Sequence, residues 1–166
     1  MRWIALLAAV LLAGCGADLD WRELRARDAG FVASLPGRAF EESRPLAGRE
    51  GVQMHQWSAR ARNTVFAVGY ADFPRIDAAT LAGLRDALVR NIGGRMEKEQ
   101  PIVLGDANGF EVLARGEGGG APLELRLRLL SRGARVYQAA TLGPPGELSP
   151  TELETFFGSL KLETAR

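Results

Sequence analysis

The chain has 166 residues with 21 Lys and Arg against 20 Asp and Glu, so its formal net charge is +1. This near-balance argues against nucleic acid as the partner, because binding to phosphates needs a basic surplus. One cysteine and one histidine cannot supply an internal disulfide or a zinc site of His and Cys ligands. The length and the 46% of hydrophobic residues suit a single domain with its own core.

The chain begins with the pattern of a secretory leader. Met1 and Arg2 precede an apolar run over residues 3–13, which has the length of a signal-peptide h-region. It is shorter than the roughly 20 apolar residues that span a bilayer. The run ends in Leu12-Ala13-Gly14-Cys15, which resembles the lipobox of bacterial lipoproteins. The resemblance implies that residues 1–14 are a signal peptide and that Cys15 carries lipid.

Lipid on Cys15 would be the membrane anchor. Two or three acyl chains such as palmitate hold a protein on a membrane almost permanently. In Gram-negative lipoproteins, Asp directly after the lipidated cysteine favours retention in the inner membrane. This chain has Gly16 there, so by resemblance to those sorting rules it is expected on the outer membrane, facing the periplasm. Two alternatives remain open: a conventional cleavage site around Cys15-Gly16-Ala17, and a buried core cysteine. Under the lipobox interpretation, residues 15–20 form the lipidated cysteine and a short tether, and residues 21–166 form a single domain.

The first half of this domain is predicted to be mostly strands. Residues 31–35 run into a Pro36-Gly37 turn, and the strand at 64–72 ends at Phe73-Pro74. Between them, strands at 40–45 and 52–59 flank the glycine-bearing loop AGREG, and residues 60–63 form a turn.

A helix is predicted from Ala78 to Ile92. Asp77 is the expected N-cap and Gly93-Gly94 the expected stop. The apolar side chains recur three and four residues apart and make one stripe. Its members are Leu81, Leu84, Leu88 and Ile92.

Strands follow again at 109–115, 123–130 and 135–142, separated by the loop GEGGGAP and the turn Arg132-Gly133. In 123–129, leucines at the odd positions alternate with Glu124, Arg126 and Arg128, as in a half-buried antiparallel strand. The sequence Ser149-Pro150-Thr151-Glu152 has the signature of a capping box and predicts a short helix reaching Phe157. Gly158 is expected to end this helix, and a last strand is predicted at 160–162. The predicted class is α+β: an antiparallel sheet of about seven strands flanked by two helices.

Four segments, GFVASLPGRAF, VFAVGYADFP, ARVYQAATLG and FFGSLKL, together resemble bacterial members of the PsbP/Mog1-like fold over residues 29–162. The chain departs from the family at Leu35, where a phenylalanine often precedes the proline-glycine pair. The resemblance implies an α/β/α sandwich. Members of the family act as assembly or binding factors, on photosystem II in one case and on a small GTPase in another. No catalytic residues belong to the fold, so it implies a binding module.

Few residues suggest catalysis. His55 is the only histidine, the chain has no Gly-x-Ser-x-Gly nucleophile elbow, and Trp57 lies on the same face of the predicted strand. His55 is thus either a structural residue or a ligand contact. GEGGG lacks the Gly-Lys-Ser/Thr ending of a phosphate loop. In LGDANGF, Asp106 and Asn108 suit a β-turn better than a calcium loop.

Four arginines form a cationic row: Arg126 and Arg128 share the polar face of one predicted strand, and Arg132 and Arg135 follow across the turn. Two interpretations remain open. Glu111 and Glu124 neutralise the row and leave a solvated face on which Arg126 and Arg128 both face water, or the row recognises anions, which arginine forks suit. In an envelope such anions belong to peptidoglycan peptides, lipid A or an acidic protein.

The sequence therefore predicts a membrane-anchored envelope lipoprotein that acts as a non-catalytic binding or accessory module. Its expected partner is an envelope protein or an anionic envelope component. No enzymatic activity, cofactor or metal is expected. The alternative is an envelope hydrolase or small-ligand carrier with a site near His55.

Overall fold

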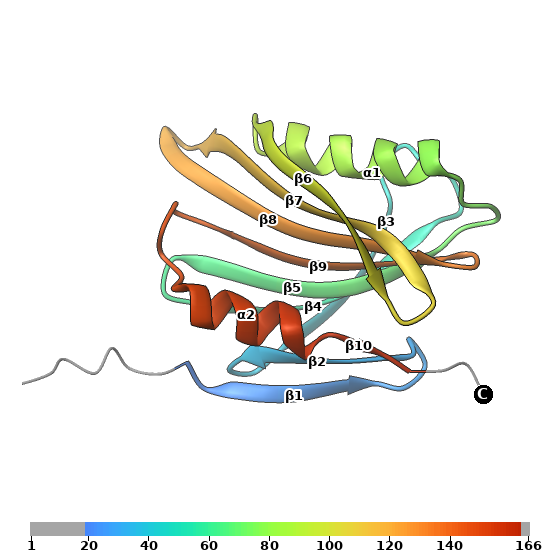
Figure 1. Ribbon diagram of the computed structural model, residues 1–166, viewed down its shortest axis with the longest axis horizontal. Helices are drawn as coiled ribbons and strands as arrows, with labels where there is room; N and C mark the ends of the chain where they lie inside the picture. Colours follow the sequence, from blue (N-terminus) through green and yellow to red (C-terminus); the bar gives the residue numbers. More distant parts are fainter. Residues whose placement is uncertain (1–18, 164–166) are drawn as a thin grey trace, which may run out of the picture.

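The computed structural model describes residues 19–163, which fold into three layers (Figure 1). Helix α1 covers one face of a seven-stranded sheet. A three-stranded sheet and helix α2 together form a second layer against the other face. The elements are β1 (Trp21–Ala26), β2 (Phe31–Pro36), β3 (Phe40–Pro45), β4 (Gln53–Ala61), β5 (Thr64–Asp72), α1 (Ala78–Asn91), β6 (Arg95–Leu104), β7 (Ala107–Gly118), β8 (Ala121–Arg132), β9 (Arg135–Gly143), α2 (Pro150–Ser159) and β10 (Lys161–Leu162).

The main sheet has the order β3-β4-β5-β9-β8-β7-β6, and every neighbouring pair is antiparallel. Hairpins join β3 to β5 and β6 to β9, and the pairing of β5 with β9 unites the two halves. The small sheet has the order β1-β2-β10. The predicted antiparallel sheet of about seven strands with two helices is therefore confirmed for the main sheet, and the second, smaller sheet was not predicted.

The alternation on β8 sets the two faces of the main sheet. Leu125, Leu127 and Leu129 are buried under α1, where Leu81 and Val89 lie in the same core. The opposite face packs Phe66 of β5 against the second layer, with Phe31 of β2 and Phe156 of α2. Each layer thus buries its own apolar cluster against the sheet, which is the main source of stability.

Both predicted helix caps are confirmed. Asp77 Oδ1 accepts a hydrogen bond of 2.7 Å from the Thr80 backbone N–H. Ser149 and Glu152 form the capping box, in which Ser149 Oγ accepts from the Glu152 N–H and Glu152 Oε2 accepts from the Ser149 N–H. The helix of residues 150–159 passes through Gly158, so this glycine does not end it.

Two strands were not predicted, β1 and β6. Both lie at the edge of a sheet and carry several charged residues. The expected turns do connect strands: Gly119 and Gly120 join β7 to β8, and Gly105 and Asp106 join β6 to β7.

The expected signal peptide, Cys15 and most of the tether lie outside the described residues. Within residues 19–163, no helix is both long enough and apolar enough to cross a membrane.

Candidate binding groove

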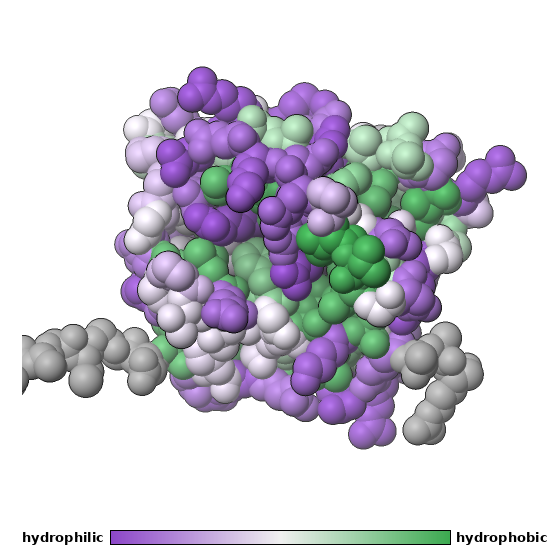
Figure 2. Space-filling view, viewed as in Figure 1, coloured by the Kyte–Doolittle hydropathy of each residue, from purple (hydrophilic) through white to green (hydrophobic). Residues whose placement is uncertain are grey.

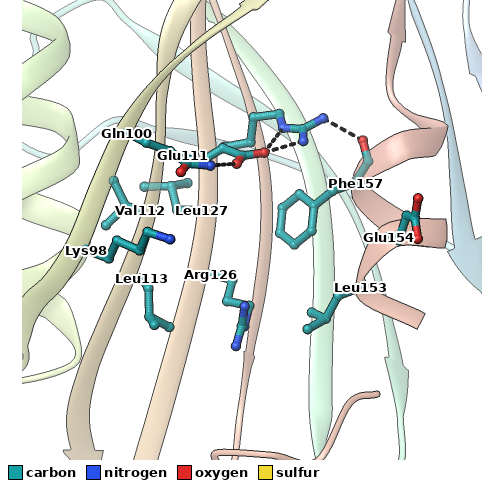
Figure 3. Close-up of a pocket in the computed structure, with 11 residues that line it drawn as sticks. Lys98, Gln100, Glu111, Val112, Leu113, Arg126, Leu127, Leu153, Glu154 and Phe157 are labelled. Atoms are coloured by element: carbon teal, nitrogen blue, oxygen red, sulfur yellow. Dashed lines mark hydrogen bonds and ion pairs between the residues drawn. The ribbon is translucent and has the colours of Figure 1, made fainter. Parts of the chain in front are cut away.

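A groove of about 350 Å³ runs between α2 and the β6–β8 part of the main sheet (Figure 3). It lies on the face that carries the second layer, at the side which the small sheet leaves uncovered. Its floor is formed by Lys98, Gln100, Glu111, Leu113, Arg126 and Arg128. Its wall is formed by Leu153, Glu154 and Phe157 of α2. We call it the α2 groove.

Strand register arranges the floor in two rows. Lys98 of β6 is paired with Leu113 of β7, which is paired with Arg126 of β8. We call these three residues the Lys98 row. The next row along the strands, the Arg128 row, consists of Gln100, Glu111 and Arg128.

The Arg128 row is neutralised internally. Arg128 Nε donates to Glu111 Oε1 over 2.9 Å, and the Gln100 amide donates to Glu111 Oε2 over 2.6 Å. Burial raises the pKa of the Glu111 carboxyl, but the hydrogen bonds from Arg128 and Gln100 outweigh it, so its pKa lies below the usual range. Glu111 is therefore held as the anion that fixes Arg128.

Arg128 also joins the sheet to α2. Its Nη1 donates to the Phe157 carbonyl oxygen over 2.7 Å, and its guanidinium lies 5.5 Å from the centre of the Phe157 ring. Because the carbonyls at the end of a helix carry a partial negative charge, a cation is favoured there. The contact fixes the wall of the groove against its floor.

The Lys98 row has two cations and no anion of its own. Lys98 forms no ion pair with any residue from 19 to 163. Arg126 Nε donates to Glu124 Oε1 over 2.7 Å, while its Nη1 and Nη2 donate to none of the described residues. The Arg126 side chain is 39% exposed. In Figure 3 the Lys98 side chain extends towards the middle of the groove. This row offers spare N–H donors on both sides of Leu113.

The expectation that Arg126 and Arg128 both face water is correct for Arg126 and wrong for Arg128. The Arg128 side chain is only 18% exposed. Helix α2 covers this part of the strand, and the contacts with Glu111 and Phe157 replace water around the guanidinium.

The other two arginines of the predicted row lie outside the groove. Arg132 donates to the Tyr137 hydroxyl over 2.8 Å and to the Glu163 carbonyl oxygen over 2.9 Å. Arg135 binds both carboxylate oxygens of Asp72, at 2.6 and 2.7 Å, and donates to the Ala29 carbonyl oxygen. The hydrogen bonds with Asp72 raise the pKa of Arg135 above its usual value. Both side chains join the main sheet to the second layer.

His55 is remote from the groove lining. Its Nδ1 is 2.7 Å from the Ser43 hydroxyl oxygen, and its ring stacks on Tyr70 with 4.8 Å between ring centres. Trp57 stacks on the same tyrosine, which confirms that His55 and Trp57 share a face. Among the described residues, Ser43 is the only hydrogen-bond partner of the His55 ring, so no carboxylate orients the ring.

No group of three His, Asp or Glu side chains in the described part of the chain is placed to hold a metal ion. Asp106 lies in the turn between β6 and β7, where Arg132 approaches it at 3.4 Å. Asp72 is the partner of Arg135.

Sequence reasoning missed most of the groove. Lys98 and Gln100 lie on β6, which was not predicted, so their pairing with β7 could not be expected. One local signal was present: Leu153 and Phe157 are four residues apart and share a face of α2.

No protein-family model and no curated protein matches this chain. Among solved structures, it is similar to a Pseudomonas aeruginosa protein, PA94, described as a protein of unknown function and putative regulator. That likeness has a TM-score of 0.44 and 17% identity, and covers 77% of this chain and 85% of the other. A Bacteroides thetaiotaomicron protein matches with a TM-score of 0.44 and 15% identity over 81% of this chain. The match covers 46% of that second protein, so the chain spans about half of its length.

Proposed function

We propose that this protein is a lipid-anchored binding or accessory module of the bacterial envelope, and that it holds its partner in the α2 groove. The partner is an envelope protein or an anionic envelope component. The observation that carries the proposal is the Lys98 row, where two cations with spare N–H donors flank Leu113 beside an apolar wall.

The lining of the groove is chemically suited to holding a ligand. Guanidinium and ammonium groups bind carboxylates and phosphates, and Arg126 adds directional donors. Leu113, Leu153 and Phe157 offer apolar surface beside these cations. Such a mixture of apolar lining with a few placed polar groups is typical of binding sites.

The architecture and the leader expected from the sequence are consistent with the same proposal. The order of layers, with α1, then the main sheet, then α2 and the small sheet, is consistent with the PsbP/Mog1-like α/β/α sandwich implied by the sequence resemblance. Lipid on Cys15 and a tether ending at residue 20 would keep the domain close to the membrane, in our proposal the periplasmic face of the outer membrane.

The test is capture of the partner from the membranes of the source cell. The lipidated full-length protein is solubilised in mild detergent beside a Lys98→Glu, Arg126→Glu double variant, and the bound material is identified by mass spectrometry. Lys161→Glu with Arg60→Glu is the matched control, because both residues are exposed on strands outside the groove. A stoichiometric partner should be lost only in the groove variant. Equal retention in both variants, or no partner at all, contradicts the proposal.

A second candidate function, hydrolysis, is favoured by one observation. The hydrogen bond between Ser43 and His55 pairs a nucleophile with a base, as in serine hydrolases. However, His55 lacks an orienting carboxylate among the described residues, and neither residue lines the groove. Labelling of Ser43 by a fluorophosphonate probe, abolished by Ser43→Ala, would favour this function over binding.

A further inference from the structure

The arrangement of the groove indicates what it binds. We infer, resting on the proposed function, that the occupant is an extended acidic segment of a partner protein. One carboxylate of that segment lies over Leu113, between Lys98 and Arg126.

The first argument is the charge pattern of the floor. The cation of the Arg128 row is paired with Glu111, and Arg115, which lies beyond the Lys98 row and outside the groove lining, pairs with Glu97 and Glu124 at 3.4 Å each. Only the Lys98 row between them lacks a matching anion in its own row. An added carboxylate therefore finds donors here and nowhere else on the floor.

The second argument is the spacing within this row. Adjacent strand backbones lie about 4.8 Å apart. Lys98 and Arg126 are two strands apart, so their backbones are separated by roughly 10 Å, with Leu113 midway. Both side chains are long enough to reach the middle from either side. A carboxylate above Leu113 can accept from both cations, and charge-assisted hydrogen bonds of this kind are strong.

The third argument concerns the shape of the site and favours a chain segment over a small molecule. The groove is partly open to solvent, with α2 as its wall and β6, the edge strand of the main sheet, at its other side. Bound small molecules typically bury about 70–90% of their surface. An open trough instead suits a segment that continues beyond it at both ends.

The fourth argument is the apolar surface around this edge. Leu153 and Phe157 form an apolar wall that faces Leu113 of the floor. Figure 2 shows an apolar area in the region of the β6–β7 hairpin, bordered by hydrophilic side chains. Apolar residues beside the carboxylate of the partner can pack on these surfaces. Pro101 and the irregularity between Met96 and Lys98 interrupt the edge, so side chains rather than a long backbone ladder carry the recognition.

The sequence offers a direct test, because Lys98 and Lys161 are its only lysines. A water-soluble carbodiimide couples an amine to a carboxylate with no spacer, and it is applied to source-cell membranes that hold the lipidated full-length protein. Peptide mass spectrometry should find Lys98 joined to an Asp or Glu in one short segment of one protein. The exposed Lys161 should not be joined to that segment.

Three variants refine this test. Lys98→Arg removes the amine and should abolish the cross-link, whereas Lys161→Arg, at an exposed position outside the groove, should leave both the cross-link and the capture unchanged. Arg126→Gln should lower the yield of the Lys98 cross-link about tenfold, the effect of losing one charged hydrogen bond.

The outcomes separate this inference from the proposed function. In one outcome, the groove variant loses a captured partner while Lys98 joins no protein carboxylate, or joins only a phosphate group. That result supports the proposed function and overturns the inference that the occupant is an acidic segment. Coupling of Lys98 only to Glu154 of its own chain also overturns the inference. If no partner is captured and no cross-link forms, both fail.

Discussion

At the scale of single residues, Arg126 and Arg128 have very different surroundings although they are two positions apart on one face of β8. Arg128 is enclosed by Glu111 and the end of α2, whereas Arg126 keeps water on one side. A hydrogen bond to a charged group contributes more when water is excluded. We therefore assign Arg128 to stability, and Arg126 remains available for the proposed binding.

Replacing Arg128 should destabilise the fold far more than replacing Arg126. Arg128→Ala removes the bonds to Glu111 and to the Phe157 carbonyl and leaves a partly buried carboxylate, so the free energy of unfolding should fall by about 2–3 kcal/mol. Arg126→Ala removes an exposed ion pair worth less than about 1 kcal/mol. Urea denaturation measures both variants, and equal losses would contradict the assignment.

Glu111 should make stability depend on pH. Burial opposes its ionisation, but the bonds from Arg128 and Gln100 prevail and its folded pKa is below the ordinary value of 4.5. A lowered pKa means that the contribution is present above 4.5 and disappears as the pH falls through the folded pKa. The difference in unfolding free energy between the native protein and Glu111→Gln should therefore shrink as the pH is lowered below 4.5.

The matched background for this prediction is Arg128→Ala. Without its main partner, Glu111→Gln should add little further pH dependence. Urea titrations at neutral pH and at several lower values give the four free energies of the cycle. A difference that grows on acidification would contradict the role given to Glu111.

At the scale of elements, close strand packing depends on one glycine of β7. A Cβ added at Gly109 would lie 1.8 Å from the Leu129 carbonyl oxygen on β8. Because this neighbour is backbone, it cannot move aside without disturbing the β7–β8 pairing. Gly158 in α2 is the opposite case, since an added Cβ there meets nothing within 4 Å.

Alanine at these two glycines should have opposite effects. Gly109→Ala should lower the free energy of unfolding by about 2 kcal/mol or more, as overpacked cores do. Gly158→Ala should raise it by about 0.5–1 kcal/mol, because alanine is the better helix former. Thermal and urea unfolding of both variants test this, and a tolerated alanine at Gly109 would show that the β7–β8 register is wrong.

At the scale of the whole molecule, three arginines of the main sheet donate to backbone carbonyls of the second layer. Arg128 reaches Phe157, Arg132 reaches Glu163, and Arg135 reaches Ala29. These contacts supplement the apolar cluster around Phe31 and Phe156. Arg128 fixes α2, and with it the wall of the groove, above the floor, while Arg132 and Arg135 attach segments next to the small sheet.

The proposed attachment to the membrane should depend on Cys15. Cys15→Ser removes the sulfur that lipid modification needs, so the protein should appear in the soluble fraction or keep its leader. Fractionation of cells, with the intact mass of the product, measures this. A variant that stays on the membrane with normal processing would contradict the lipobox interpretation.

The sequence by itself determined the features that depend on neighbours in the chain. The Ser149 capping box, the Asp77 cap and the leucine alternation of β8 are local patterns, and the structure confirms each of them. The hairpin turns are local for the same reason, since glycine allows the required backbone conformation. Together these patterns were enough to predict an antiparallel sheet with two helices.

Only the tertiary structure decided the features that depend on distant partners. The edge strands β1 and β6 have no strong alternation, because edge positions remain partly or wholly exposed, and pairing with β2 and β7 makes them strands. The same pairing brings Lys98 into register with Arg126. Helix α2 covers Arg128 but leaves Arg126 exposed, so the two arginines have different surroundings. The spacing of residues within β8 could not show this difference, because it depends on which distant element covers each side chain.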